Sequence, residues 1–156
     1  MVMTQTTISL LATLCIVVGG CDLGTEPENQ PVTTIVDGVR YTLTFQHIVF
    51  SAPDTCDGNL KVDNITTETI DLQFPSQHAL RWRLLNENDQ EVLTNPTVGL
   101  IPFSNLTLSP HGTYHFGFQL VLKDNHNIVL RSGVYRFELG LDRPSSPYLQ
   151  KLIYIR

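Results

Sequence analysis

Short stretches of alternating apolar and polar residues recur along most of the chain. Tyr41, Leu43 and Phe45 alternate with polar residues in the first of these stretches. The others centre on residues 60–62, 70–74, 80–84, 91–93, 106–108, 114–120, 135–141 and 149–155. A period of two with turn residues between stretches is typical of half-buried strands, and no window shows the 3.6-residue period of an amphipathic helix. The pattern predicts an all-β domain.

The spacing of the turns and the residue types refine this prediction. A turn about every ten residues is typical of an immunoglobulin-like antiparallel β-sandwich, here of seven to nine strands. Val, Ile and Thr far outnumber Ala, Lys and Glu after residue 20, which favours strands over helices. Trp82, the only tryptophan, is in phase with Leu80 and Leu84 and is therefore expected in the core. A sugar-stacking or partner-anchoring role for Trp82 is the alternative.

The first 20 residues contain no charged side chain, and Ile8 to Val18 are almost all apolar. A run of about 11 residues is too short to cross a membrane but fits the apolar region of a secretory signal peptide. It ends at Val18-Gly19-Gly20-Cys21, which resembles the lipobox of bacterial lipoproteins. The resemblance implies a signal peptide over residues 1–20, cleavage before Cys21 and acylation of Cys21, with palmitate among the chains. The protein would then be lipid-anchored in the cell membrane, facing the periplasm or the cell exterior; a non-lipid signal peptide is the alternative.

Residues 21–31 are polar, with two prolines and three acids, and predict a flexible acidic tether before a β-sandwich domain over residues 32–156. Those three acids supply more than half of the formal net charge of −5, so the domain is nearly neutral and nucleic acid is not an expected partner.

Loss of Cys15 and lipidation of Cys21 leave Cys56 as the remaining thiol. We expect Cys56 to be an inert residue of a turn at 53–58, with a redox or nucleophilic role as the alternative.

The chain lacks the sequence motifs of the common enzyme classes. It contains no His-Glu-x-x-His, Gly-x-Ser-x-Gly, Cys-x-x-Cys or phosphate-binding loop. His111 and His115 are four residues apart, but in a turn entering a strand they would lie about 13 Å from each other. We therefore expect no catalytic residues, no metal site and no cofactor, and a binding protein rather than an enzyme.

Between residues 59 and 141 the order of short segments resembles the BsuPI-like intracellular proteinase inhibitor family. The matching positions are Asn64 after the first strand, Phe74 and Ser76 after the next, Trp82, the turn glycine Gly112, and Gly133 with Tyr135. The resemblance implies an immunoglobulin-like β-sandwich and inhibition of a serine protease. Leu80-Arg81 departs from the Tyr-Asp that often stands there in the family, and His111 separates its usual Pro-Gly. A lipoprotein address also differs from the cytoplasmic location of the family's protease.

Taken together, these features predict a non-enzymatic, membrane-anchored lipoprotein whose domain binds a protein partner in the cell envelope, a protease being one candidate. Residues 74–79 and 94–103 are the candidate inhibitor loops, and ordinary connections between strands are the alternative for both. A glycan-binding or cell-wall-binding module using Tyr41 or Tyr148 is a second hypothesis. A structural adaptor that adds a strand to a partner's sheet is a third.

Overall fold

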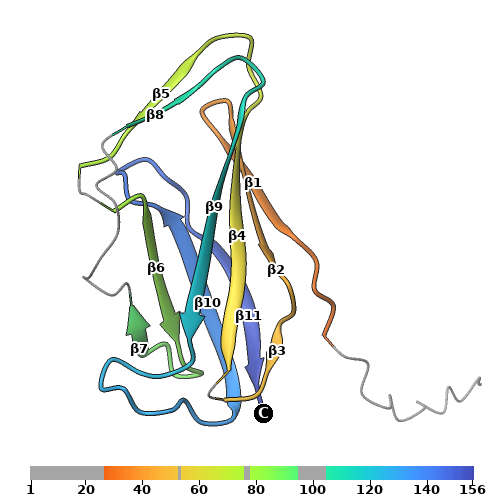
Figure 1. The fold of residues 1–156 in the computed structure, drawn as a ribbon, viewed down its shortest axis with the longest axis vertical. Coiled ribbons are helices and arrows are strands. Elements are labelled where there is room, and N and C mark those ends of the chain that lie inside the picture. Colours follow the sequence, from red (N-terminus) through yellow and green to blue (C-terminus); the bar gives the residue numbers. More distant parts are fainter. Residues whose placement is uncertain (1–26, 53, 76–77, 95–104) are drawn as a thin grey trace, which may run out of the picture.

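The structure, a computed structural model, describes residues 27–52, 54–75, 78–94 and 105–156. These residues form eleven strands and no helix, arranged as two facing sheets with a smaller two-stranded sheet at one end (Figure 1). The prediction of an all-β sandwich is confirmed, and the immunoglobulin-like topology stays a prediction. The predicted signal peptide, Cys15, Cys21 and the tether up to residue 26 lie outside the described residues.

Two sheets make the body of the sandwich. Sheet A has the order β1-β2-β4-β9 and consists of β1 (Val32–Val36), β2 (Val39–Phe45), β4 (Thr55–Asn64) and β9 (Thr113–Val121). Sheet B has the order β3-β11-β10-β6-β7 and consists of β3 (Val49–Phe50), β11 (Leu149–Ile155), β10 (Gly133–Leu141), β6 (Leu80–Leu85) and β7 (Glu91–Thr94). Neighbouring strands are antiparallel, except that β3 runs parallel to β11.

The number of strands exceeds the predicted seven to nine because β1 and β3 are present as well. In β1, burial alternates, but Thr34 stands at an inner position and Ile35, 54% exposed, at an outer one, so the sequence shows no alternation of apolar and polar residues. In β3, only Val49 and Phe50 pair with β11. A two-residue strand is too short to leave a period in the sequence, and its position is set by its neighbour.

The third sheet pairs β5 (Ile70–Gln73) with β8 (Asn105–Leu108) and lies at the end of the molecule far from the C-terminus (Figure 1). The buried amide of Asn64 joins it to sheet A. Its nitrogen donates to the carbonyl oxygens of Glu68, Leu108 and Ser109, at 2.6, 3.2 and 2.9 Å. Its oxygen accepts from the backbone nitrogen and hydroxyl of Thr66, at 2.9 and 2.7 Å. The end of β4 is thereby tied to the start of β5 and the end of β8.

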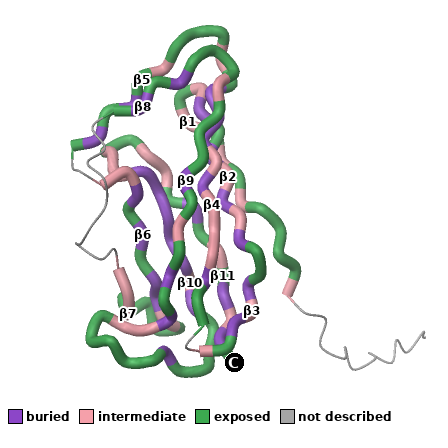
Figure 2. Tube along the Cα trace, viewed as in Figure 1, coloured by how far each residue is buried: buried purple, intermediate pink, exposed green. Residues whose placement is uncertain are grey.

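The core lies between the inner faces of sheets A and B, where buried residues alternate with exposed ones along the strands (Figure 2). Phe137 of β10 contacts the rings of Phe45, Phe118 and Trp82, with centroid distances of 5.3, 5.4 and 6.0 Å. Trp82 is 9% exposed, which confirms the predicted core position. Aromatic groups from both sheets thus meet at the centre of the sandwich.

The last residues assigned to the tether lie against the domain. The side chain of Asn29 donates to the carbonyl oxygen of Phe45 at 2.9 Å, and the ammonium of Lys151 donates to that of Gln30 at 2.6 Å. These contacts fix where the chain enters the sandwich. Within the described ranges, no helix is long and apolar enough to cross a membrane.

Candidate binding surface on the outer face of sheet B

The outer face of sheet B carries the largest group of interacting charged side chains in the described structure. Alternation along β10 directs Phe137 and Leu139 into the core and Arg136 and Glu138 outward. The strand register then places Glu138 opposite Arg83 of β6 on one side and opposite Gln150 of β11 on the other. Residues from three strands therefore meet around one carboxylate.

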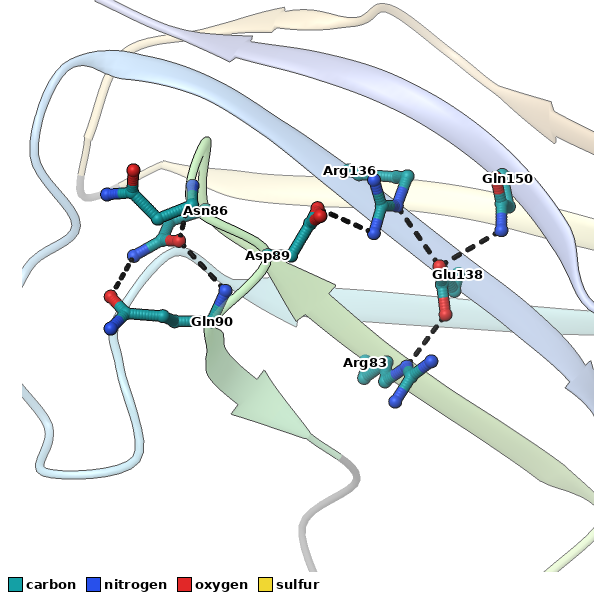
Figure 3. Close-up of polar contacts among 8 residues, drawn as sticks. Arg83, Asn86, Asp89, Gln90, Arg136, Glu138 and Gln150 are labelled. Atoms are coloured by element: carbon teal, nitrogen blue, oxygen red, sulfur yellow. Dashed lines mark hydrogen bonds and ion pairs between the residues drawn. The ribbon is translucent and has the colours of Figure 1, made fainter.

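Both oxygens of the Glu138 carboxylate accept hydrogen bonds, although its side chain is only 4% exposed (Figure 3). The Arg83 Nε donates to Oε2 at 2.7 Å. The Arg136 Nε and the Gln150 Nε2 donate to Oε1 at 3.1 and 3.0 Å. The hydrogen bond and the charge of Glu138 raise the pKa of Arg83 above its ordinary value. We call these four residues the Glu138 cluster.

The turn between β6 and β7 extends the cluster. Asp89 has a left-handed backbone, with φ of 59°, and its carboxylate lies 2.9 Å from the Arg136 guanidinium. The side-chain oxygen of Asn86 accepts from the backbone nitrogens of Asn88 and Gln90, at 2.9 and 3.0 Å, which holds the turn in place (Figure 3). Arg136 is therefore held between two carboxylates, one buried and one exposed.

A second group, formed by Arg81, Arg83 and Tyr148, lies next to the Glu138 cluster, and we call it the arginine–tyrosine platform. The guanidinium carbons of Arg81 and Arg83 lie 4.7 and 5.9 Å from the centroid of the Tyr148 ring. Distances below about 6 Å are those of cation–π contacts. Both arginines are exposed, and Tyr148 is 38% exposed.

Gly140 makes room for this platform. It pairs with Arg81 in the register of β10 and β6, and Ser146 and Pro147 lie against it. A Cβ atom at position 140 would lie 2.6 Å from the carbonyl oxygen of Pro147, closer than real Cβ contacts. The absent side chain allows Tyr148 to reach from the start of β11 across β10 to the arginines of β6.

Apolar side chains border the outer face toward the other end of the sheet. Leu152 and Val134 are 48% and 43% exposed. A shallow pocket of about 210 Å³ lies between them, Arg136 and the turn at residues 86–89. A neighbouring groove of about 250 Å³ is lined by Val134, Tyr154 and Pro27, among others. Exposed apolar groups beside arginine and tyrosine are the residue types enriched in protein interfaces.

The outer face of sheet A consists instead of cross-strand pairs and one small group around Asp63. Thr33 donates to Thr42 at 3.2 Å, the Asn59 amide lies 3.2 Å from the His115 ring, and Gln119 donates to Asp57 at 2.8 Å. Asp63 accepts from Thr113 at 2.6 Å and pairs with Lys61 at 2.9 Å. Burial alone would raise the pKa of Asp63, but the hydrogen bonds from Thr113 and Lys61 lower it below its ordinary value.

Cys56 does not lie in a turn, contrary to the sequence prediction. It lies in β4, is 0% exposed and pairs with Leu120 of β9. Burial, and then the negative charge of Asp57, raise the pKa of its thiol far above the ordinary value. A protonated and inaccessible thiol is a poor nucleophile, so the buried position favours the inert role that the sequence predicts over a redox or nucleophilic one.

The structure also separates several other candidate residues. Tyr41 is 2% exposed in β2, so it cannot be a stacking platform for a glycan, whereas Tyr148 is accessible. His111 occupies a left-handed turn position, with φ of 57°, and His115 lies in β9. The residues that the structure describes contain no group of three or more His, Cys, Asp or Glu side chains suited to a metal.

The two candidate inhibitor loops connect the same pair of structural units. Residues 74–79 lead from β5 to β6, and the second candidate, residues 94–103, begins at the last residue of β7 and leads back toward β8. Their ends on the two-stranded sheet are adjacent, because Gln73 pairs with Asn105. Phe74 is 7% exposed and belongs to the core, so it cannot serve as an exposed inhibitory side chain. Residues 76–77 and 95–104 lie outside the described residues.

Sequence reasoning missed the Glu138 cluster and the role of Gly140. The outward phase of Arg81, Arg83 and Glu138 follows from the alternation of their strands. The contact between Arg83 and Glu138 joins residues 55 positions apart and depends on the register of β6 with β10. The sequence does carry one signal for the cluster. An acidic residue stands at an outward position of one strand, and arginines stand at outward positions of other strands, so they could pair on one face of a sheet.

No protein-family model matches the chain, and no curated protein matches it. Among solved structures, it is similar to the sporulation control protein Spo0M of Bacillus subtilis, with a TM-score of 0.48 and 13% identity over 78% of this chain and 50% of that one. It is also similar to the β-glucosidase EmGH1 of Erythrobacter marinus, with a TM-score of 0.49 and 13% identity over 80% of this chain and 16% of that one. For the alkylpurine DNA glycosylase AlkC of Pseudomonas fluorescens the TM-score is 0.47 and the identity 6%, over 76% of this chain and 30% of that one. The chain spans at most half the length of these proteins, and at such TM-scores the similarities carry no argument about function.

Proposed function

We propose that this protein is a non-enzymatic, membrane-anchored lipoprotein that binds a protein partner in the cell envelope through the outer face of sheet B. The observation that carries the proposal is the Glu138 cluster. Burying a carboxylate on a sheet face that could be fully solvated costs free energy unless the charge is well paired. Here the pairing holds arginine side chains in fixed positions at the surface, which is what a preformed protein-binding face requires.

The same geometry supports a binding role over a catalytic one. A general base needs a carboxylate with a free oxygen directed toward a substrate. In the Glu138 cluster, each carboxylate oxygen already accepts a hydrogen bond from a side chain of the sheet. Within the Glu138 cluster, this arrangement supports a role in ordering the surface rather than in moving a proton.

Within this role, a BsuPI-like inhibitor of an envelope protease is the form that the sequence resemblance suggests. The hydroxyl of Tyr135, near the start of β10, donates to the carbonyl oxygen of Arg131 at 2.9 Å. A tyrosine that bonds to the backbone a few residues upstream is a feature of immunoglobulin-like sandwiches and supports that part of the proposal. The adjacent ends of the two candidate loops, at Gln73 and Asn105, agree with a single loop-bearing edge.

The proposed lipid anchor at Cys21 places the domain close to the bilayer. Cys21 lies six residues before Pro27, the first described residue. Six extended residues span at most about 20 Å. Because Asn29 and Gln30 are bonded to the sandwich, the end of the domain beside Pro27 would face the membrane.

Mass spectrometry of the mature N-terminus tests the anchor directly: an unmodified or uncleaved N-terminus would contradict it.

Photo-cross-linking of the full chain in its native membrane tests the binding face. A cross-linking amino acid at Leu152, on the outer face of sheet B, should give one discrete protein adduct. The matched control at Gln119, on the outer face of sheet A, should give none. Adducts from position 119 alone, or from neither position, would contradict the proposed face.

A separate measurement addresses the inhibitor form. The full chain in detergent is added in micromolar excess to subtilisin-type and envelope proteases. Slowed substrate hydrolysis is the expected result. A discrete adduct at position 152 without any inhibition would leave a binding protein and reject the inhibitor form.

A further inference from the structure

We infer that the arginine–tyrosine platform recognises carboxylate groups on an extended acidic segment of the protein partner. This inference rests on the proposed function and names the chemistry of the partner.

The two guanidinium groups are held in place before any partner arrives. Arg83 uses its Nε for Glu138, at 2.7 Å, so the outer edge of its guanidinium remains available on a side chain that is 45% exposed. Arg81 lies over the Tyr148 ring, with its central carbon 4.7 Å from the centroid. A guanidinium that is already ordered loses less conformational entropy when it binds, and its planar fork suits a carboxylate.

The spacing of the arginines matches an extended chain. Arg81 and Arg83 are two residues apart on one face of β6, which places their Cα atoms about 7 Å from each other. In an extended partner segment, side chains two residues apart have the same separation. A segment with a glutamate at every second position could therefore place one carboxylate against each guanidinium.

Two acidic side chains of this face are paired with arginines, and Glu91 of β7 acts on Arg83 only through its charge. Glu138 is buried under Arg83 and Arg136, and Asp89 pairs with Arg136. The platform therefore presents positive charge on a domain that is otherwise nearly neutral. Complementary charge supplies orientation and specificity in protein association.

The position of the platform favours a protein partner over the anionic lipid surface. Tyr148 precedes the first residue of β11, whereas Ile155, at its other end, lines the groove that Pro27 also lines. Seven residues of strand separate the two ends by about 23 Å. The tether joins the domain at the Pro27 end, so the platform lies at the far end of sheet B from the proposed anchor.

The test measures peptide binding to the full chain in detergent micelles. The probe is a synthetic peptide of alternating threonine and glutamate, and the control peptide has glutamine in place of each glutamate. We expect binding of the glutamate peptide with chemical-shift changes at Tyr148, at least tenfold weaker binding of the glutamine peptide, and weaker binding as salt rises. R81Q should weaken binding of the glutamate peptide about tenfold. R81K should weaken it by less, because lysine keeps the positive charge but lacks the planar guanidinium that donates two hydrogen bonds to one carboxylate.

The matched control is R40Q, which removes one exposed positive charge from β2 on the outer face of sheet A and should leave binding unchanged. R81 is chosen over R83 because its removal leaves the Glu138 hydrogen bonds intact. Equal binding of both peptides, or equal losses in R81Q and R40Q, would overturn the inference. Binding to phosphatidylglycerol vesicles that depends on Arg81, without peptide binding, would assign the platform to lipid phosphate and also overturn it.

The cross-link from position 152 distinguishes this inference from the proposed function. If the R81Q variant fails to bind the peptide and its discrete adduct at position 152 is lost, both stand. If the adduct forms as strongly in R81Q as in the parent chain, partner binding stands and carboxylate recognition is rejected. If the parent chain gives no adduct at all, the proposed function itself is rejected.

Discussion

On the outer face of sheet A, most polar side chains bond to one partner on the next strand, and Asp63 bonds to both Thr113 of β9 and Lys61 of its own strand. Asp57 with Gln119 is a directly opposite pair, and Asn59 bonds diagonally to His115, which stands opposite Lys61 in the register. On the outer face of sheet B, side chains from β6, β10 and β11 converge on the single carboxylate of Glu138. The first arrangement is modular, since one pair can be lost without affecting the next, whereas the second links three strands through one buried charge.

On the proposed function, this difference separates the needs of folding from those of binding. Exposed cross-strand pairs contribute about 0.2–1 kcal/mol each and suffice to keep a sheet face in water. A buried, paired carboxylate brings a desolvation penalty that a solvated face does not require. The additional order at Glu138 is therefore best explained by the fixed positions of Arg83, Arg136 and, next to them, Tyr148.

Substitution of Arg83 should give the largest effect that separates the two faces. Arg83→Met leaves the buried Glu138 carboxylate without its shortest hydrogen bond, and we expect a loss of about 2–3 kcal/mol in the free energy of unfolding. Arg40→Met, opposite Asp63 on the outer face of sheet A, removes an attraction to that carboxylate from an exposed side chain and should lose less than about 1 kcal/mol. Urea unfolding followed by fluorescence of the buried Trp82 measures both. In the double variant Arg83→Met/Glu138→Met, the loss of unfolding free energy should be smaller than the sum of the losses in the two single variants. Strict additivity would show that Arg83 and Glu138 are not coupled.

The glycines in the two outer faces provide a second comparison. At Gly140, an added Cβ would lie 2.6 Å from the Pro147 carbonyl oxygen, so Gly140→Ala should lose about 2 kcal/mol and displace the Tyr148 ring. At Gly117 in β9, an added Cβ would meet no atom within 4 Å. Gly117→Ala should therefore be neutral or gain up to about 1 kcal/mol, because alanine restricts the unfolded chain. Unfolding curves and the Tyr148 ring resonances are the measurements, and equal effects at the two positions would contradict the explanation given for Gly140.

The contrast between these glycines shows what the sequence can predict. The period of two predicted the all-β sandwich, and the inward phase of Trp82 was predicted by the same alternation. Tyr41 belongs to an inward phase as well, and its burial follows from that phase rather than from its aromatic character. Gly140 and Gly117 are equivalent in the sequence, since each stands at an outward position of a strand. Only the approach of Ser146 and Pro147 to Gly140 distinguishes them.

Cys56 shows why local signals fail where tertiary pairing decides the structure. The neighbouring Pro53, Asp54 and Gly58 are typical of a turn, and the sequence therefore indicated one. In the fold, β4 already begins at Thr55, because Cys56 and Gly58 pair with Leu120 and Phe118 of β9. The Glu138 cluster escaped prediction for the same reason: strand order and register are set by packing over the whole chain.

The carboxylate of Asp63 allows the comparison to be extended to pH. Hydrogen bonds lower its pKa in the folded state below the unfolded value of about 3.9, so its stabilisation is complete above that value and is lost as the pH falls through the folded pKa. Asp63→Asn should therefore lose about 1 kcal/mol at pH 7 and show little difference from the parent chain in strong acid. Urea unfolding between pH 2 and 7 is the measurement. A deficit that persists unchanged in acid would show that the charge of Asp63 is not the cause.

The smallest expected effect is at the Asn59–His115 pair on the outer face of sheet A. Both side chains are exposed, and their nitrogen atoms lie 3.2 Å from each other. Asn59→Ala and His115→Ala should each lose about 0.5 kcal/mol or less, with a coupling between them of a few tenths of a kcal/mol in a double-mutant cycle. The same cycle on Arg83 and Glu138 should give a coupling several times larger. If the two couplings were equal, the outer face of sheet B would be no more ordered than that of sheet A, and the main reason for placing the partner there would be lost.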